Sequence, residues 1–341
     1  MIRTGLIGYG LGGSAFHAPL IEAVPGLALA AVVSSRGEQV QAAHPGAAVL
    51  SDPQALFADP DIDLVVISTP NDTHVPLAEA ALRAGKHVVL DKPLSPRPEQ
   101  GEALIALARA QGRLLSVFHN RRWDGDFLTV QRLIGDGRLG DVMLYEARWD
   151  RFRPAIKPGW REEPGDGAGL FLDLGPHLID QALQLFGRPE AVSADIVAQR
   201  AAARVDDYFE VTLHYGARRA ILSAASLVVA NRPRFAVHGS GGSFVKFGLD
   251  PQEAALRAGA RADDPRHGLD DPAHHGVFTD ADGTREAIET ERGDYRRFYA
   301  GVAAAIAGGA PVPVDPADAV LGLRLIALAR QSAAEGRRLT V

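Results

Sequence analysis

The sequence predicts an α/β protein of two domains, the first built on a parallel sheet and the second an α+β domain with a large, mostly antiparallel open sheet. Over the first third of the chain, short apolar strand patterns alternate with helical patterns, which is typical of βαβ units. Later strand patterns follow one another through short links, which favours antiparallel pairing. The length of 341 residues agrees with about two domains.

The composition is that of a globular protein without cysteine. Apolar residues make up 46% of the chain and charged residues 23%, and the basic residues are scattered at a net charge of -6. We therefore expect no nucleic-acid partner. With no run of about 18 apolar residues and no signal-peptide pattern, we expect a cytoplasmic protein with no membrane partner. Without a thiol, redox chemistry must use a bound cofactor.

A glycine-rich turn follows the first strand pattern. The apolar residues 2–8 run into G-Y-G-L-G-G, a helical pattern follows, and the next strand is expected at 29–33. In this context Gly8 permits a tight turn, Gly10 lets a pyrophosphate approach the backbone, and Gly13 allows close packing of helix on strand. The pattern predicts a Rossmann dinucleotide-binding domain. A simple glycine-rich turn is the alternative.

The residues after the second strand bear on the choice of dinucleotide. An NAD-specific protein usually places Asp or Glu there to accept from the ribose 2′-hydroxyl. This chain has Ser34, Ser35 and Arg36, whose hydroxyls and guanidinium suit a 2′-phosphate. We therefore predict NADP as the cofactor. NAD is the weaker alternative, because Glu38 lies close by and Arg36 could be a solvated first-turn residue.

Further strand patterns at 64–68, 87–90 and 114–117 bring the located strands to five of an expected six-stranded unit and place a domain boundary near residue 120. We expect an NADP-binding domain at 1–120 and a substrate-binding and oligomerisation domain at 121–341.

Ligands of an open parallel sheet gather outside the carboxyl ends of its strands. Thr69, Asn71 and His74 follow one strand, and Lys92 follows the next. These four residues are candidates for the cofactor side of the site. A turn followed by a helix start would also explain Asn71 and His74.

The segment 169–180 predicts a mostly apolar helix with a polar stripe. Asp173, His177 and Asp180 are spaced at i, i+4 and i+7, so they share one face. A divalent metal site, a general base with an orienting carboxylate, and a histidine satisfied in the core all fit this pattern. With a dinucleotide site in the same chain, the general-base interpretation is favoured and no metal is expected.

The rest of the second domain is expected to form a wide sheet, with strands at 191–198, 208–215, 220–229, 235–238 and 244–247. The Pro-, Gly- and Arg-rich stretch 151–169 is typical of a substrate-site loop. The polar stretch 250–284 is interpreted as a long excursion, and two helices close the chain. Few helices remain to cover such a sheet, so we expect self-association.

Four motifs stand out along the chain: G-Y-G-L-G-G at 8–13, T-P-N-D-T-H at 69–74, A-G-K-H-V-V-L-D-K-P at 84–93 and D-L-G-P-H-L-I-D at 173–180. Together they resemble the glucose-fructose oxidoreductase, inositol dehydrogenase and rhizopine-catabolism (Gfo/Idh/MocA) family over essentially the whole chain. Three further features, F-H-A-P-L at 16–20, F-H-N-R-R-W-D at 118–124 and W-R at 160–161, resemble its NADP-dependent scyllo-inositol dehydrogenase branch.

The resemblance implies a cofactor held by the first domain, and a second domain whose open sheet carries the substrate site and builds a homodimer or homotetramer. The lysine of the family's E-K-P motif falls on Lys92, its helical histidine on His177, and the preceding aspartate on Asp173. Asp91 stands where the family usually has Glu, which shortens the reach of that carboxylate.

The expected function is reversible hydride transfer between NADP(H) and a secondary alcohol of a polyol or sugar, such as scyllo-inositol and its inosose. His177 suits the general base, Asp173 a substrate or imidazole partner, and Lys92 a donor to the reacting oxygen. A non-catalytic NADP-sensing protein and a metal-dependent sugar isomerase or epimerase are the alternatives. Further candidates for the substrate hydroxyls are Asn120, Arg122, Trp160 and Arg161.

Overall fold

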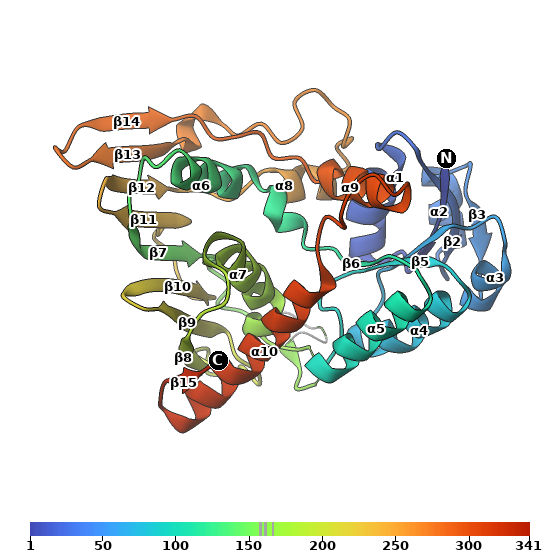
Figure 1. Ribbon diagram of the computed structural model, residues 1–341, viewed down its shortest axis with the longest axis horizontal. Helices are drawn as coiled ribbons and strands as arrows, with labels where there is room; N and C mark the ends of the chain where they lie inside the picture. The colour runs from blue at the N-terminus through green and yellow to red at the C-terminus, as the bar shows by residue number, and fades with distance from the viewer. Residues whose placement is uncertain (157–158, 160–161, 166) are drawn as a thin grey trace. The chain divides into compact units, whose positions relative to one another are not determined.

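The computed structural model describes residues 1–156, 159, 162–165 and 167–341. The chain divides into two compact units, each described here by itself (Figure 1). The first unit comprises Met1–Trp123, Gln252–His267 and Asp294–Val320, and the second comprises Asp124–Pro251, Gly268–Gly293 and Leu321–Val341. Two segments from the last hundred residues therefore pack with the N-terminal third.

The first unit is built on a six-stranded parallel sheet, as the sequence predicted. Its strands are β1 (Ile2–Ile7), β2 (Leu27–Val33), β3 (Ala48–Leu50), β4 (Leu64–Ile67), β5 (His87–Leu90) and β6 (Leu115–Val117). Their order is β3-β2-β1-β4-β5-β6, so the strand order reverses beside β1. The four residues of β4 are fully buried, which explains its continuous apolar run. The sequence pattern did not locate β3, because it is three residues long and largely exposed.

Helices connect the strands of the first unit. The helix after the glycine-rich turn begins as a π-helix, η1, whereas the sequence pattern predicted only that this segment is helical. The Ser116 hydroxyl donates to the Val314 carbonyl at 2.8 Å, which ties a C-terminal segment to this unit. The helices are η1 (Gly12–His17), α1 (Ala18–Glu22), α2 (Gly37–Ala43), α3 (Pro53–Ala58), η2 (Asn71–Thr73), α4 (His74–Arg83), α5 (Pro98–Ala110), η3 (Asn120–Trp123), α8 (Gln252–Arg257) and α9 (Arg296–Ile306).

The second unit carries a nine-stranded sheet. Its strands are β7 (Val142–Arg148), β8 (Ala191–Val197), β9 (Tyr208–Tyr215), β10 (Arg218–Ala225), β11 (Phe235–Gly239), β12 (Gly242–Lys246), β13 (Gly276–Asp280), β14 (Arg285–Ile288) and β15 (Leu339–Thr340). The order is β14-β13-β12-β11-β7-β10-β9-β8-β15. Strands β7 and β10 pair in parallel and the other pairs are antiparallel, which confirms the mostly antiparallel sheet.

The stretch 250–284, interpreted as a long excursion, contains a strand that the sequence pattern did not locate. This strand, β13, forms a hairpin with β14 that extends the sheet beyond β12. Its pattern is faint because β14 exposes three of its four residues, and the connecting turn is rich in aspartate. Phe278 of β13 is nonetheless 5% exposed and joins the core.

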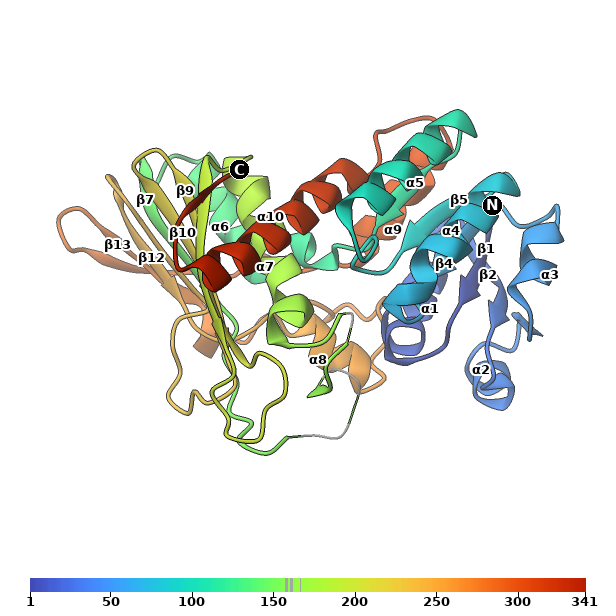
Figure 2. The same ribbon diagram turned by 90° about the horizontal axis from the view of Figure 1, so that it is seen from below.

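Helices α6 (Gly125–Gly135) and α7 (Leu170–Phe186) pack on one face of this sheet (Figure 2). Alternate residues point into the core between them: Phe209, Val211 and Leu213 of β9 are at most 1% exposed. The last helix, α10 (Pro316–Glu335), begins in the first unit and ends in the second.

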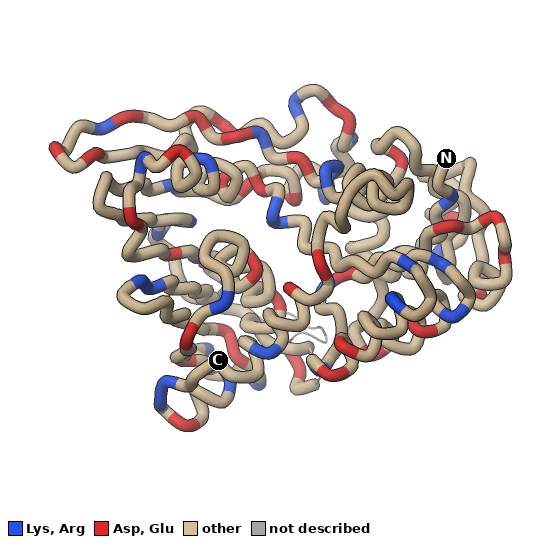
Figure 3. Tube along the Cα trace, viewed as in Figure 1, with Lys and Arg blue, Asp and Glu red and all other residues tan. Residues whose placement is uncertain are grey.

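Charged side chains of both signs are interspersed over both units (Figure 3). Within the described residues, no helix is both long enough and apolar enough to cross a membrane.

Candidate cofactor site and candidate substrate site

The glycines of the glycine-rich turn in the first unit have different surroundings. Gly8 has φ +97°, and a Cβ there would lie 2.2 Å from the Ser68 carbonyl oxygen. A Cβ on Gly13 would lie 2.1 Å from the Gly8 carbonyl oxygen, so the helix packs directly on the turn. Gly10 has no atom within 4 Å of its Cβ position. The open side of Gly10 is where a phosphate group could approach the backbone, and the turn therefore fits a dinucleotide.

The residues predicted to bind the ribose 2′-phosphate of NADP follow the end of β2. The backbone N–H of Arg36 donates to Ser34 Oγ at 2.9 Å, and Arg36 Nη1 donates to the Tyr9 carbonyl at 3.3 Å. The guanidinium is therefore held beside the glycine-rich turn, while Ser35 is exposed. This arrangement places hydroxyl and guanidinium donors at one edge of the sheet.

His74, a predicted cofactor residue, is fully buried. Its Nδ1 lies 2.8 Å from the Pro93 carbonyl oxygen and its Nε2 lies 3.0 Å from the Thr69 carbonyl oxygen. The imidazole thus joins the turns that follow β4 and β5, and it would serve a cofactor indirectly. Thr69 and Asn71 are partly exposed on the first of these turns.

Lys92 follows β5, and its backbone N–H donates to Asp91 Oδ1 at 2.8 Å. Asp91 also accepts from Ser68 Oγ at 3.2 Å. Burial acts to raise the pKa of Asp91, but the facing His17 imidazole and the charges of Lys92 and His74 outweigh it and lower that pKa to about 2. The carboxylate beside Lys92 is therefore ionised at any working pH.

In the second unit, helix α7 places the predicted catalytic pair. Asp173 and His177 lie one turn apart, as predicted, and the His177 side chain is 7% exposed. The His177 ring lies 6.4 Å from the ring of Trp149, centroid to centroid. Asp180, the third member of the stripe, is 4% exposed. Across the described ranges, no three His, Asp or Glu side chains are grouped so as to hold a metal ion.

Local packing explains where this helix begins and which residues its first turns accept. Gly169 has φ +93°, and the Phe171 N–H donates to Asp206 Oδ2 at 2.6 Å, which satisfies a free N–H of the first turn. Burial raises the pKa of Asp206 although this N–H and Arg330 act to lower it. A Cβ on Gly175 would lie 2.6 Å from the Phe171 ring, so only glycine fits there. Pro176 then removes one helical hydrogen bond just before His177.

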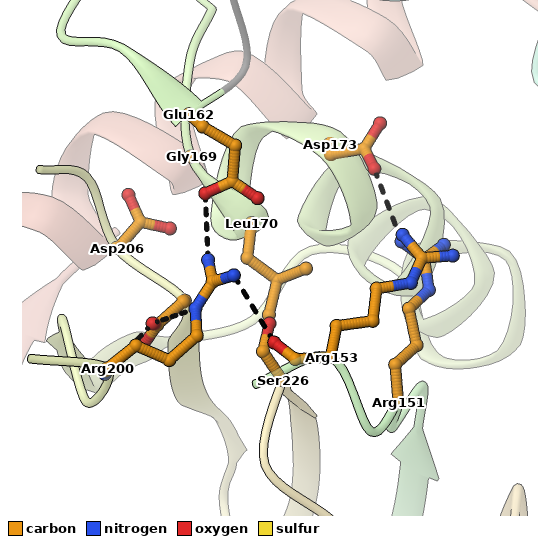
Figure 4. A pocket seen from close by; sticks show the side chains of 10 residues that line it. Arg151, Arg153, Glu162, Gly169, Leu170, Asp173, Arg200, Asp206 and Ser226 are labelled. Atoms are coloured by element: carbon orange, nitrogen blue, oxygen red, sulfur yellow. Dashed lines mark hydrogen bonds and ion pairs between the residues drawn. The ribbon is translucent and has the colours of Figure 1, made fainter. Parts of the chain in front are cut away.

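Asp173 lines a polar pocket at the start of α7, and every described lining residue belongs to the second unit (Figure 4). The cavity volume is about 70 Å³. Asp173 Oδ2 lies 3.8 Å from Arg151 Nη1, within ion-pair distance. The lining residues are Arg151, Arg153, Glu162, Gly169, Leu170, Asp173, Arg200, Asp206, Asp207 and Ser226.

Arg200 makes several hydrogen bonds in the wall of this pocket and is 8% exposed. Its Nε donates to Asp207 at 2.7 Å and its Nη2 to Glu162 at 2.8 Å. Its Nη1 donates to the carbonyls of Arg153 and Ala155, each at 3.3 Å. One buried guanidinium therefore ties the loop before α7 to the start of β9.

Two further predicted substrate residues, Asn120 and Arg122, belong to η3 of the first unit, where Asn120 is 6% exposed and Arg122 pairs with Asp318 at 2.9 Å. Trp160 and Arg161 lie outside the described residues. Sequence reasoning missed Arg151, Arg200 and Asp207, although the Arg-rich composition of 151–169 gave a signal for the first of them.

Two family models match this chain. One, described as the oxidoreductase family NAD-binding Rossmann fold, matches residues 2–119, and the other, the oxidoreductase family C-terminal alpha/beta domain, matches residues 131–341. Both are models of the Gfo/Idh/MocA family.

Individual proteins are similar over nearly the full length. The uncharacterized oxidoreductase YdgJ of Escherichia coli is 48% identical over 97% of this chain and 96% of its own. The scyllo-inositol 2-dehydrogenase (NADP(+)) IolW of Bacillus subtilis is 42% identical over 98% and 95%. The solved structure of the oxidoreductase yvaA from Bacillus subtilis matches with a TM-score of 0.97 at 42% identity, covering 100% of this chain and 98% of that one.

Proposed function

The chain belongs to the Gfo/Idh/MocA oxidoreductase family, and on that premise we propose that it transfers a hydride reversibly between NADP(H) and a secondary alcohol of a cyclitol or sugar. The best candidate pair is scyllo-inositol and its ketone, an inosose. The name of the relative IolW, which is 42% identical to this chain, supports that choice of substrate and of cofactor.

The observation that carries the proposal is the arrangement on α7. Asp173 faces a polar pocket, and His177 follows one turn later on the same side of the helix. Oxidation of a carbinol requires removal of the hydroxyl proton as hydride leaves carbon. An imidazole titrates near neutral pH and suits that proton transfer, which is typically worth roughly 10² to 10⁴ in rate.

The residues of the first unit support the cofactor half of the proposal. The open backbone at Gly10 and the donors Ser34, Ser35 and Arg36 fit a dinucleotide with a 2′-phosphate. When bound, the nicotinamide would supply the hydride acceptor or donor. Lys92 is assigned as donor to the reacting oxygen, where its ammonium would stabilise developing alkoxide.

His177 would accept the hydroxyl proton during oxidation and return it during reduction. Asp173 and Arg151 would hold the neighbouring hydroxyls of the polyol, because a carboxylate accepts from a hydroxyl and a guanidinium donates to one. The assignment requires that Lys92 and His177 both reach one reacting carbinol.

The decisive experiment is a panel of inositols and sugars tested with NADP and with NAD, followed at the nicotinamide absorbance. We expect NADP reduction with scyllo-inositol and little with NAD. Tight NADPH binding without turnover of any polyol or sugar would favour the sensing alternative. Activity lost to a chelator and restored by a divalent ion would favour the isomerase.

Variants test the assigned residues. Lys92→Ala and His177→Ala should each lower kcat by at least about 10²-fold while NADPH binding stays nearly intact. His274→Ala is the matched histidine control, because that side chain is 54% exposed and lies outside the assigned set. Wild-type turnover in both Lys92→Ala and His177→Ala would refute the assignment.

We also propose self-association through the sheet face opposite α6 and α7. On β8, Ala194 and Ile196 pack toward the core, whereas the alternate residues Asp195 and Val197 are exposed. On β10, Ile221 is likewise partly exposed between core residues. A face that mixes apolar and polar residues in this way is suited to an interface. A monomeric mass by light scattering at micromolar concentration would contradict this proposal.

A further inference from the structure

We propose that His17 and Tyr299 are positioning residues for the Asp91–Lys92 pair, through a buried chain of contacts from the Tyr299 hydroxyl, through the His17 imidazole, to the Asp91 carboxylate. The proposal rests on the proposed role of Lys92 in the reaction. It concerns residues of the first unit alone, and it gives a task to the F-H-A-P-L motif, which the proposed function leaves unexplained.

One contact of this series is short and the other is longer. His17 Nδ1 lies 2.6 Å from the Tyr299 hydroxyl, and His17 Nε2 lies 3.5 Å from Asp91 Oδ2. The side chains of His17 and Tyr299 are fully buried, whereas that of Asp91 is 26% exposed. His17 Nε2 has no hydrogen-bond partner of standard geometry in the described part of the chain, so we assign the Asp91 carboxylate as the charged group that it faces.

Donor and acceptor chemistry determines which group donates in each of these contacts. A neutral imidazole carries one N–H and one acceptor nitrogen. With Nε2–H directed at the carboxylate, Nδ1 is the acceptor and the Tyr299 O–H is the donor. Burial and the nearby charge of Asp91 raise the pKa of Tyr299 well above its usual value, so the hydroxyl keeps its proton.

Asp91 connects three parts of the first unit. Oδ1 accepts from the backbone N–H of Lys92, and Oδ2 accepts from Ser68 Oγ at the end of β4. A Cβ on Gly12 would lie 2.8 Å from Asp91 Oδ2, so the carboxylate also packs against the glycine-rich turn. The contact from His17 thus steadies the group that holds the lysine backbone beside that turn.

Side-chain length explains why this carboxylate belongs to an aspartate. A glutamate is one methylene longer, and from the same backbone it would push its carboxylate toward Gly12 or His17. His17 is the last residue of η1, and π-turns are often found at functional sites. The exchange of Glu for Asp, relative to the family pattern, is therefore matched by the histidine that approaches from η1.

The groups around Asp91 determine how these buried contacts affect the orientation of Lys92. The groups that face the carboxylate are His17 from η1, Lys92 itself, His74 from α4 and Tyr299 from α9. Loss of the His17 or Tyr299 contact should let the carboxylate shift, and the orientation of Lys92 beside it should change with it.

The test measures the acylation rate of Lys92 without turnover. The chain has four lysines, Lys86, Lys92, Lys157 and Lys246, so competitive acylation at one fixed pH, followed by mass spectrometry, can compare them. We expect the largest change in the Lys92 labelling rate, relative to the wild type, in Asp91→Asn. His17→Leu and Tyr299→Phe should give smaller changes in that order, with kcat reduced and the polyol KM little changed.

Matched controls keep the test decisive. Tyr299→Phe removes one oxygen and keeps the ring, so it remains informative if His17→Leu fails to fold. Tyr145→Phe is its control, because the Tyr145 hydroxyl is also fully buried and, by contrast, has no hydrogen-bond partner among the described residues. Lys86, whose ammonium donates to the Ile62 carbonyl at 2.8 Å, is an internal reference for labelling.

The outcomes separate this inference from the proposed function. Unchanged Lys92 labelling in both His17→Leu and Tyr299→Phe, or an equal shift in Tyr145→Phe, would overturn the inference even if the enzyme oxidises a polyol. If no polyol is oxidised, the proposed function fails, and a labelling shift in Tyr299→Phe would still support the positioning contacts.

Discussion

Two glycines of the same turn should respond to alanine in opposite ways. In Gly13→Ala the new Cβ would lie 2.1 Å from the Gly8 carbonyl oxygen, and both atoms belong to rigid backbone. A separation of about 3.4 Å or more is ordinary for such a pair, so the helix or the turn must move by more than an ångström. Overpacking of this kind costs typically about 1–3 kcal/mol.

In Gly10→Ala the new Cβ meets no atom within 4 Å, and φ at Gly10 is not in the left-handed region. The fold should therefore be unaffected or slightly stabilised, by about 0.4–1 kcal/mol, because alanine restricts the unfolded chain. The same methyl group occupies the space through which a pyrophosphate would approach. We expect the affinity for NADPH to fall at least about tenfold.

Urea unfolding and fluorescence titration with NADPH measure the two effects separately. Gly10→Ala should keep its unfolding midpoint and lose affinity, whereas Gly13→Ala should lose stability. Wild-type NADPH affinity in Gly10→Ala would refute the assignment of that open backbone to the cofactor. An unchanged midpoint in Gly13→Ala would show that the close packing of helix on turn is not required.

Three further predictions follow from the charged groups. Arg36→Ala should weaken NADP binding by roughly 10- to 100-fold and leave NAD binding unchanged in titrations with each cofactor, because only NADP carries the 2′-phosphate. The pKa of Asp91 is lowered to about 2, so its ionised form contributes stability above a pH of about 4, and this stability is lost as the pH falls through about 2. Asp91→Asn should therefore lower the free energy of unfolding by about 2 kcal/mol at neutral pH. The difference in unfolding free energy between the wild type and Asp91→Asn should be smaller at pH 3 than at pH 7. Asp207→Ala should lower the free energy of unfolding in urea by about 1–3 kcal/mol, because the buried Arg200 loses one of its two carboxylate partners and keeps Glu162, whereas Arg204→Ala, which breaks an exposed pair with Glu163, should leave the midpoint unchanged.

Local patterns were sufficient for the elements whose signal lies in neighbouring residues. The strands at 87–90 and 208–215 were predicted with the bounds that the structure gives. The spacing of Asp173 and His177 on one helix face was likewise predictable, because it depends only on helical periodicity.

Contacts between distant residues were beyond such reasoning. Arg122, a predicted substrate residue, pairs with Asp318, which lies 196 residues further along the chain. The return of α9 to the first unit and the ties from Arg200 to the loop before α7 are also long-range. No periodicity encodes these pairings, since each depends on which segments the fold brings together.

A fourth glycine shows how the glycine-rich turn and the segment that carries Lys92 constrain one another. Gly12 occupies a variable position of the G-x-G-x-x-G pattern, so the dinucleotide gives no reason for it. A Cβ at this position would lie 2.4 Å from Ser68 Oγ and 2.8 Å from Asp91 Oδ2. Glycine is needed there because the carboxylate that holds the Lys92 backbone packs against the turn itself. The residue that looked redundant in the motif is thus explained by Asp91, and a longer side chain at either position would separate the turn from the lysine.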